Sequence, residues 1–486
     1  MAKKILIVGG GYAGFYTAWK LEKLLRSGEA EVTIVDPLPY MAYLPFLPEV
    51  AAGSIEPRHA VVARRRHLKR TANIAGKVTG ISHATKTATI TPTVGEAYDF
   101  EYDQIVITTG SVSRTFPIPG IADLAIGMKT IEEAVAIRDR MVGNFERAAS
   151  LPKDSAERAR LLTVTVVGGG FAGIESVAEL RSFATTLLRR YPEITFDETK
   201  FHLVEAMGRI MPEVTEGLAD WVVKDQTRRG VDIHLNTQLS SAEGGNIELS
   251  TGENYESDLI VWTAGVMPRP FLKGTDLPIG GRGHVVGTPS LRVATEEGEI
   301  VEGAWTAGDT SQVPDISSTP GPGGFCVPNA QHAVRQGKLL AKNIVATLRG
   351  EGVHEYNHKN AGAVAGLGMN TGVFRSGNFT LKGYVAWLAH RFYHGLAIPT
   401  WERKWRVFGG WVGHFFLGRD IVNIEAVTEP RAHPQQPPAP GAGADRRAAG
   451  RRRCRPRRPS HPTRRTRRAA RGRRESRPRT SRRAPG

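Results

Sequence analysis

Cysteine is the scarcest residue in this sequence, because only Cys326 and Cys454 occur among 486 residues. Two cysteines so far apart form neither a CxxC dithiol pair nor a disulfide framework. Chemistry that depends on either is excluded, and a reducing compartment is indicated. Long apolar runs are also missing. No stretch reaches the roughly 18 consecutive apolar residues that a membrane-spanning helix needs, so we expect no such helix.

Lysine is absent from residues 431–486, where 20 arginines accompany one aspartate and one glutamate. This segment carries a net charge of +18, and because the whole chain carries +17, residues 1–430 are close to neutral at −1. A segment with so few large apolar residues buries too little surface to fold, so we expect a disordered Arg/Pro-rich tail. Its exclusive use of arginine also fits an out-of-frame gene end. The alternative is binding of nucleic acid or an anionic membrane by charge alone, and no specific nucleic-acid partner is expected.

What the sequence does contain is a glycine-rich turn that occurs twice. A chain of 486 residues exceeds the size of one hydrophobic core, so at least two domains are expected. The apolar residues 4–8 predict a buried parallel strand, and Gly9-x-Gly11-x-x-Gly14 follows them before a helical segment. In such a unit the first glycine makes the turn, the second lets the backbone approach a pyrophosphate, and the third lets the helix pack on the strand. Asp36, at the end of the next strand, can accept hydrogen bonds from ribose hydroxyls.

Residues 163–205 repeat this pattern. Gly168-x-Gly170-x-x-Gly173 follows a run of β-branched residues, and Glu205 ends the next strand. One glycine-rich turn is weak evidence for a nucleotide site, but two copies in the same strand–turn–helix context strongly indicate two dinucleotide sites. The carboxylate of Glu205 favours a free 2′-hydroxyl over a 2′-phosphate, so NADH is expected rather than NADPH.

Other residues at strand ends extend the two sites. Small-residue turns at Thr109-Gly110 and at Gly265 each follow an apolar strand, one in each unit. Asp309 ends a further apolar strand and can reach a ribityl or phosphate group of a long cofactor. Arg209, four residues beyond Glu205, could soften the preference for NADH. The residues inside the two turns that are assigned to the same sites are Tyr12, Ala13 and Phe171.

These motifs together resemble the two-dinucleotide flavoprotein reductases, over residues 1 to about 345. The resemblance implies FAD in the first site, NAD(P)H in the second, and an FAD domain completed by the chain that follows the second unit. The missing cysteines separate the chain from the disulfide and sulfide:quinone reductases of that superfamily. It looks most like the type II NADH dehydrogenases, which are single-subunit NADH:quinone oxidoreductases. The stretches that carry this match are YMAYLPFLPEVAAGSIEP (40–57), GGGFAGIESVAEL (168–180) and NAQHAVRQGKLLAKNI (329–344).

The resemblance also implies two catalytic residues. Glu175 matches a family glutamate that lies where the nicotinamide and the quinone meet the flavin, and its carboxylate could relay a proton. By position alone, Glu175 is also an acid favoured by the dipole of its helix. Gln331 matches the first glutamine of the family's quinone-site helix. The second glutamine is replaced by Arg335, with Gln336 one position later, so the quinone contacts depart from the family pattern. No metal site is expected.

Residues 371–430 are rich in aromatic and cationic side chains, and four of the eight tryptophans lie between Trp387 and Trp411. Apolar residues recur at helical spacing from Leu381 to Phe392. Aromatic belts beside cations are typical of helices in a bilayer interface. Together with the resemblance, this predicts peripheral association with the cytoplasmic face of the cell membrane. The alternative is a homodimer contact or a pair of helices that packs on another domain.

The predicted fold is α/β, with two nested Rossmann-like dinucleotide-binding domains, of which the FAD domain is discontinuous, and a C-terminal amphipathic membrane-facing segment. The predicted parts are 1–120 (FAD-binding domain, first part), 121–285 (NAD(H)-binding domain), 286–370 (FAD-binding domain, second part, with the quinone-site helix), 371–430 (membrane-associating region) and 431–486 (disordered tail). The predicted function is hydride transfer from NADH to FAD and then two-electron transfer to a membrane quinone, without proton pumping. A soluble NAD(P)H reductase with a protein acceptor such as a ferredoxin stays open as an alternative. So does a non-enzymatic flavoprotein that acts through the tail.

Overall fold

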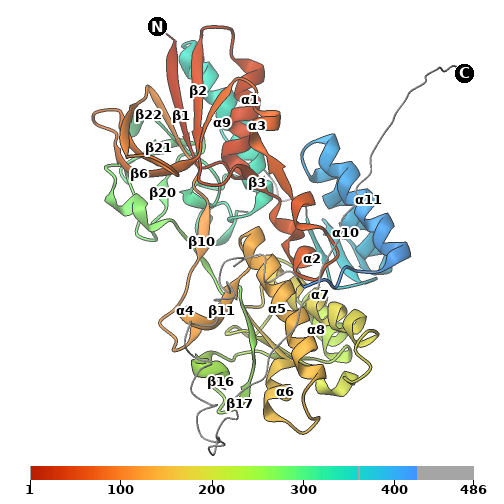
Figure 1. Cartoon of the computed structure of the whole chain (residues 1–486). Helices are drawn as coiled ribbons and strands as arrows, with labels where there is room; N and C mark the ends of the chain where they lie inside the picture. The colour runs from red at the N-terminus through yellow and green to blue at the C-terminus, as the bar shows by residue number, and fades with distance from the viewer. Residues whose placement is uncertain (1, 319, 359–361, 424–486) are drawn as a thin grey trace, which may run out of the picture. The chain divides into compact units, whose positions relative to one another are not determined.

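The computed structural model describes residues 2–318, 320–358 and 362–423, so the predicted tail 431–486 lies outside the described residues. Two sheets, one parallel and the other mostly parallel, form the main part of the described chain together with the helices packed against them (Figure 1). The predicted α/β class with two dinucleotide-binding units is confirmed.

The first sheet has six strands in the order β21-β22-β9-β1-β2-β5. The strands are β1 (Lys3–Val8), β2 (Ala30–Val35), β5 (Thr71–Ile74), β9 (Gln104–Ile107), β21 (Arg292–Ala294) and β22 (Ile300–Thr306). Every neighbouring pair is parallel except β21 with β22. Because β22 comes late in the chain but pairs with β9, the first unit is discontinuous in sequence, as predicted.

Two helices from distant parts of the chain pack against each other beside this sheet (Figure 1). They are α1 (Tyr12–Leu24) and α9 (Ala330–Leu348). Gly337 makes the contact possible, because a β-carbon there would lie 2.5 Å from the carbonyl oxygen of Ala13. The hydroxyl of Thr17 donates to the Gly337 carbonyl at 3.1 Å. The late helix α9 therefore belongs to the first unit.

The second sheet has five parallel strands in the order β11-β18-β12-β13-β14. The strands are β11 (Ala125–Gly127), β12 (Thr163–Val167), β13 (Lys200–Val204), β14 (Val231–His234) and β18 (Leu259–Trp262). The main helices of this unit are α5 (Ile131–Ala149), α7 (Phe171–Leu188) and α8 (Glu216–Arg228). The first of them begins after Thr130, which forms a reciprocal capping box with Glu133.

The chain passes between the two sheets twice, and the two passages pair with each other. Strands β10 (Ser111–Ser113) and β19 (Val266–Pro268) form an antiparallel ladder. Beside this ladder, the indole nitrogen of Trp262 donates to the Arg114 carbonyl at 2.9 Å. The passage that leaves the first unit is thus fixed to the one that returns to it.

Smaller elements complete the two units. They are β3 (Tyr40–Ala42), α2 (Leu47–Ala51), β4 (Val61–Ala63), α3 (Arg64–His67), β6 (Gly76–Ser82), β7 (Thr87–Pro92), β8 (Tyr98–Glu101), α4 (Ile121–Leu124), α6 (Ala156–Leu161), β15 (Leu239–Ser241), β16 (Asn246–Leu249), β17 (Asn254–Glu256), β20 (Val285–Val286) and β23 (Ser311–Gln312). Helix α2 belongs to the first unit by sequence but packs against α5 and α7 of the second. This contact brings the predicted flavin-side segment against the second nucleotide unit.

The C-terminal part of the described chain is a small antiparallel sheet followed by two helices. These elements are β24 (Ala363–Gly366), β25 (Gly372–Ser376), β26 (Phe379–Gly383), α10 (Tyr384–Ala397) and α11 (Trp401–Leu417). The helical spacing predicted from Leu381 is wrong at its start, because Leu381 lies in β26 opposite Phe374. Gly383, with φ of +73°, separates the strand from the helix. Within residues 2–318, 320–358 and 362–423, no helix combines the length and apolarity needed to cross a membrane.

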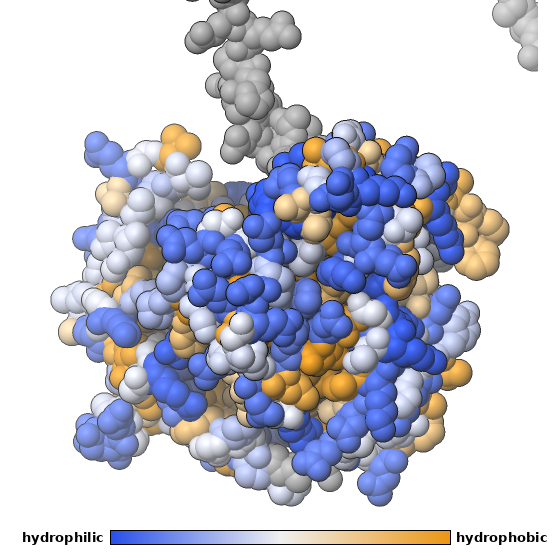
Figure 2. All heavy atoms as spheres, turned by 90° about the horizontal axis from the view of Figure 1, so that it is seen from below, coloured by the Kyte–Doolittle hydropathy of each residue, from blue (hydrophilic) through white to orange (hydrophobic). Residues whose placement is uncertain are grey.

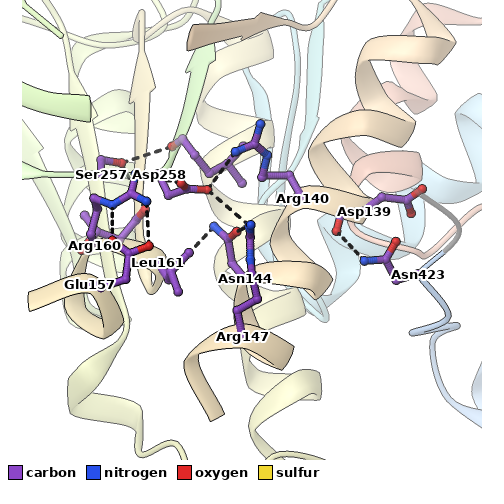
Figure 3. Close-up of polar contacts among 12 residues, drawn as sticks. Asp139, Arg140, Asn144, Arg147, Glu157, Arg160, Leu161, Ser257, Asp258 and Asn423 are labelled. Carbon is purple, nitrogen blue, oxygen red and sulfur yellow. Dashed lines mark hydrogen bonds and ion pairs between the residues drawn. The ribbon is translucent and has the colours of Figure 1, made fainter. Parts of the chain in front are cut away.

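A buried aspartate connects two helices to the second sheet (Figure 3). The side chain of Asp258, just before β18, is 6% exposed. It pairs with Arg140 of α5 at 3.1 Å, with Arg147 of α5 at 3.9 Å and with Arg160 of α6 at 2.9 Å. One carboxylate thus holds α5 and α6 against the start of β18.

Asp258→Asn should lower the stability of the fold by about 1–2 kcal/mol, because the amide keeps the size of the side chain but leaves three arginines without their shared charge. Urea denaturation followed by circular dichroism measures the effect. Asp232→Asn is the matched control, since the side chain of Asp232 is 60% exposed. Equal midpoints for Asp258→Asn and the wild type would contradict a stabilising role for this ion-pair network.

Candidate active site

Both glycine-rich turns adopt the same backbone geometry. Gly9, after β1, has φ of +100°, and Gly168, after β12, has φ of +109°. Side chains rarely tolerate this left-handed region. A β-carbon at Gly9 would lie 2.4 Å from the Thr108 carbonyl oxygen, and one at Gly168 would lie 2.7 Å from the Thr263 hydroxyl. Both conformation and space therefore require the first glycine of each motif.

The other two glycines of each motif have opposite surroundings. A β-carbon at Gly14 or Gly173 would lie 1.9 or 1.8 Å, respectively, from the carbonyl oxygen of the first glycine of its own motif. Helices α1 and α7 therefore begin directly against their strand ends. A β-carbon at Gly11 or Gly170 would meet nothing within 4 Å. This open space adjoins helix N-termini, whose unpaired N–H groups favour anions, so both turns fit a pyrophosphate.

The predicted acids lie at the rim of each turn. Asp36 Oδ2 accepts a hydrogen bond from the backbone of Gly10 at 2.7 Å, and its Oδ1 accepts one from the backbone two residues on, at 2.8 Å. Glu205 repeats the pattern with the backbone N–H groups of Gly169 and Met207. A carboxylate has about four acceptor positions, so both acids retain capacity for ribose hydroxyls.

Two arginines near these acids differ in their partners. Arg64 is 2% exposed, and its Nη1 lies 3.4 Å from Asp36 Oδ1. It places a positive charge beside the first turn, where a diphosphate is expected. Arg209 instead pairs with Glu216 at 3.8 Å and donates to a backbone carbonyl. The contacts of Arg209 are therefore with Glu216 and the backbone, and no ion pair with Glu205 is formed among the described residues.

Asp309 and Thr109 meet where the neighbouring strands β22 and β9 end. The hydroxyls of Thr109 and Thr310 lie 2.9 Å apart, and Asp309 Oδ2 accepts from Ser111 at 2.9 Å. Lys129, which precedes α5 in the second unit, pairs with Asp309 at 3.8 Å. This cluster joins the two units beside the predicted ribityl position.

The remaining predicted cofactor residues lie at the same strand ends. Gly110 and Gly265 follow β9 and β18, and a β-carbon at either would meet nothing within 4 Å. Tyr12 and Phe171 occupy equivalent positions as the first residues of α1 and α7, with Tyr12 buried and Phe171 half-buried. Ala13 is also buried. It contacts Gly337 of α9, so it packs within the protein.

The two predicted catalytic residues come from different units, and both contact the segment 362–366 that contains β24. Glu175, at the start of the second turn of α7, accepts from the backbone N–H of Gly366 at 3.0 Å. Gln331, in the first turn of α9, donates to the carbonyl of Gly362 in a long hydrogen bond of 3.5 Å. The two backbone groups are four residues apart in one extended segment, which corresponds to about 13 Å. The two predicted catalytic residues therefore contact the same segment, at positions separated by about 13 Å along it.

Glu175 also faces a buried histidine that sequence reasoning did not assign. His390 of α10 is 2% exposed. Its Nε2 lies 3.5 Å from Glu175 Oε1, and its Nδ1 lies 3.9 Å from Glu49 Oε1 of α2. The ring of His394 lies 4.7 Å away, and its Nδ1 is 2.9 Å from the hydroxyl of Tyr43. The imidazole of His390 thus lies between two carboxylates from two different helices.

Further charges surround this histidine. Arg391 pairs with Glu49 at 3.2 Å, and Arg419 pairs with Glu179 at 3.1 Å. Burial, with a smaller contribution from His390, lowers the pKa of His394 well below its ordinary value. His394 is therefore neutral near pH 7 and adds no charge to the cluster.

Arg335 stands where the family's quinone-site helix has its second glutamine, and Gln336 follows it; the two side chains have different partners. Arg335 donates to the carbonyl of Gln331 at 3.1 Å, one turn back in α9. Gln336 is buried and accepts from the backbone N–H of Gly308 at 2.8 Å, so it fixes the turn after β22.

Burial raises the pKa of the Cys326 thiol to about 11. That thiol is protonated at neutral pH, which makes it a poor nucleophile.

Sequence reasoning missed Arg64, Lys129 and His390, and each reaches the site only through the tertiary fold. Arg64 begins a basic run after β4, and His390 lies in the aromatic C-terminal region. Neither context distinguishes a site residue from a surface residue. For Lys129 the sequence holds no signal that could have identified it.

A family model described as pyridine nucleotide-disulphide oxidoreductase matches residues 3–337. A type II NADH:quinone oxidoreductase of Staphylococcus epidermidis is 30% identical over 377 residues, which cover 76% of this chain and 89% of that protein. The type II NADH:quinone oxidoreductase NdhA of Mycobacterium tuberculosis is 26% identical, covering 86% and 87% of the two chains. A structure of NDH2 from Plasmodium falciparum in complex with NADH shares the fold with a TM-score of 0.79 at 18% identity, covering 87% of this chain and 100% of that one. The chain therefore belongs to the pyridine nucleotide-disulphide oxidoreductase family and, within it, to the type II NADH:quinone oxidoreductases.

Proposed function

We propose that this chain oxidises NADH and reduces a membrane quinone, with FAD as its bound cofactor and without pumping protons. The observation that carries the proposal is that Glu175 and Gln331, which come from different units, both contact the short segment 362–366 next to α10. A donor site and an acceptor site must meet for electrons to pass between them. The type II NADH:quinone oxidoreductases named above support the same donor and acceptor.

The two turns divide the nucleotides between them. Gly11, Asp36 and Asp309 would hold the diphosphate, ribose and ribityl groups of FAD, and Arg64 would balance the diphosphate charge. Glu205 would accept from the ribose hydroxyls of NADH at the second turn. Bound FAD supplies the hydride acceptor and the two-electron donor, which side chains do not provide. The protein contributes position and charge.

Reduction of a quinone to a quinol takes up two protons with two electrons, so the acceptor site needs a proton source. The side chain of Glu175 is 14% exposed, and in its protonated form the carboxyl group can donate a proton to a quinone oxygen. His390 would then return a proton to Glu175 from Nε2 while taking one at Nδ1 from the side of Glu49, once these contacts of 3.5 and 3.9 Å shorten to hydrogen-bond distance. An imidazole flanked in this way transfers a proton without turning its ring.

We further propose that α10 and α11 hold the chain on the cytoplasmic face of a membrane, where NADH is available. Orange residues gather at the right edge of the molecule, the side on which Figure 1 draws these helices (Figure 2). The large apolar residues of the two helices that are 41% to 85% exposed are Tyr384, Val385, Leu388, Phe392, Tyr393, Leu396, Trp401, Trp405, Val412, Phe415, Phe416 and Leu417. Contiguous apolar surface of this kind marks a membrane or protein contact. A homodimer through the same face is the alternative.

The two half-reactions test the function. Anaerobic mixing with NADH should bleach the flavin absorbance, and a water-soluble short-chain quinone should then restore it. In Glu175→Gln, bleaching should stay near the wild-type rate while reoxidation slows by about 10²–10⁴-fold, because the amide keeps the bond to Gly366 but carries no transferable proton. Stopped-flow absorbance measures both steps.

Glu213→Gln, at an exposed position, is the control and should leave both steps unchanged. Wild-type protein that bleaches with NADH but is not reoxidised by quinone would redirect the proposal to a soluble reductase with a protein acceptor such as ferredoxin. Equal slowing of both steps in Glu175→Gln would remove Glu175 as the proton donor.

Glu205→Ala should lower kcat/KM for NADH by about 10- to 100-fold, because the ribose hydroxyls lose a charged acceptor. The value for NADPH should fall less or rise, since a negative charge that repels the 2′-phosphate is gone. Steady-state rates with both nucleotides measure the ratio, with the exposed Glu213→Ala as control. An unchanged NADH/NADPH ratio would show that Glu205 does not select the nucleotide.

Phe415→Ser, Phe416→Ser and Leu417→Ser combined should weaken binding to phospholipid vesicles by at least about 100-fold, since each buried large apolar side chain contributes about 1 kcal/mol or more. NADH oxidation with a water-soluble quinone should persist. Co-sedimentation measures binding, and the combined Val94→Ser and Met207→Ser variant removes exposed apolar residues elsewhere. Loss of a dimer in gel filtration, with vesicle binding intact, would favour the homodimer.

A further inference from the structure

A cavity of about 530 Å³ lies between α7 and the C-terminal end of α11. Four arginines line it, Arg181, Arg189, Arg229 and Arg419, together with Phe415. The described residues that line it include no aspartate or glutamate. A volume of this size is typical of sites that hold a whole small molecule and not a single ion.

The positive charge of the cavity is only partly balanced. Arg229 and Arg419 each pair with a carboxylate behind the cavity wall. Among the described parts of the chain, neither Arg181 nor Arg189 forms an ion pair. Arg181 donates to the Arg229 carbonyl at 2.9 Å, and its guanidinium lies 4.0 Å from the centre of the Phe196 ring. Burial, and then the charge of Arg229, lower the pKa of Arg181 to about 10.

Arg419 supplies an independent observation. Its side chain is 2% exposed, and its Nη2 reaches Glu179 at 3.1 Å and Ser182 at 3.3 Å. Its Nε and Nη1 are buried and make no hydrogen bond with any described residue. Buried donors without acceptors cost stability, so this guanidinium lacks an acceptor that a bound anion would supply.

We propose that this cavity binds the phosphate group of an anionic phospholipid. Phe415 lines the cavity and is 83% exposed, and Phe416 and Leu417 follow it at 75% and 85%. The arginines would take the phosphate while the acyl chains continue onto these apolar side chains. Inorganic phosphate shares the headgroup's chemistry but would leave Phe415 and most of the volume unused. The inference deepens the proposed membrane association and rests on it for the placement of α11.

The test compares two neighbouring arginines that carry the same charge. Arg189 lines the cavity and Arg190 does not, and both are exposed. Arg189→Gln should weaken binding to vesicles of phosphatidylcholine mixed with phosphatidylglycerol by about tenfold, the effect of losing one charge-assisted hydrogen bond. Arg190→Gln should bind like the wild type, and all three proteins should bind equally to phosphatidylcholine alone. Equally weakened vesicle binding in both variants would show that only the general surface charge matters, and it would refute the cavity as a lipid site.

Calorimetry in solution separates the two sources of phosphate. A water-soluble short-chain phosphatidylglycerol should bind the wild type and bind Arg189→Gln about tenfold more weakly, and inorganic phosphate should bind the wild type more weakly than the lipid does. Inorganic phosphate that binds as tightly as the lipid, and is lost in Arg189→Gln, would overturn the lipid assignment. Because the soluble lipid needs no bilayer, its Arg189-dependent binding without any vesicle binding would refute the membrane proposal and leave the site standing. Turnover with a water-soluble quinone should be unchanged in both variants.

Discussion

The contact of each nucleotide helix with its own strand end is the constraint on which the rest of the structure depends. Gly14 and Gly173 lie so close to the carbonyls of Gly9 and Gly168 that no β-carbon fits. In both units a threonine on the neighbouring strand donates its hydroxyl to that same carbonyl. If a side chain pushed either helix away, its first N–H groups would no longer face the open space beside the second glycine, and the anion site would be lost.

A second close approach, between Gly337 and Ala13, positions helix α9. Gly337 lets α9 rest on Ala13, and the Thr17 hydroxyl bonds across this contact between residues 320 positions apart. The register of α9 then sets two glutamines in different roles. Gln336 fixes the turn that carries Asp309, and Gln331 reaches the segment of β24. Helix α9 is therefore positioned by α1, the helix that begins at the first glycine-rich turn.

The sequence alone predicts the features that are specified by residues close to one another along the chain. The Gly9 and Gly168 turns, and the acids that follow them, are each specified by a strand–turn–helix–strand segment with characteristic residues at fixed spacing. Arg64 and His390 could not be found this way, because only tertiary packing brings them to Asp36 and Glu175. The spacing between Leu381 and the apolar residues after it predicts a helix. The backbone of Leu381 instead pairs with β25, so the residue lies in a strand. Local periodicity does not encode such pairing.

The charges around His390 are difficult to explain by stability alone. Glu49, Glu179 and Arg419 are each at most 7% exposed, and apolar replacements of a buried ionic cluster often stabilise a fold. The cluster joins α2, α7 and α10, which carry the predicted flavin-side segment, Glu175 and part of the exposed apolar surface. On α10 the buried His390 and the exposed Phe392 are two residues apart and therefore lie on different faces of the helix. Under the proposed function, the helix that meets the bilayer also holds the proton source against Glu175, so a quinone arriving from the membrane would reach electrons and protons at the same place.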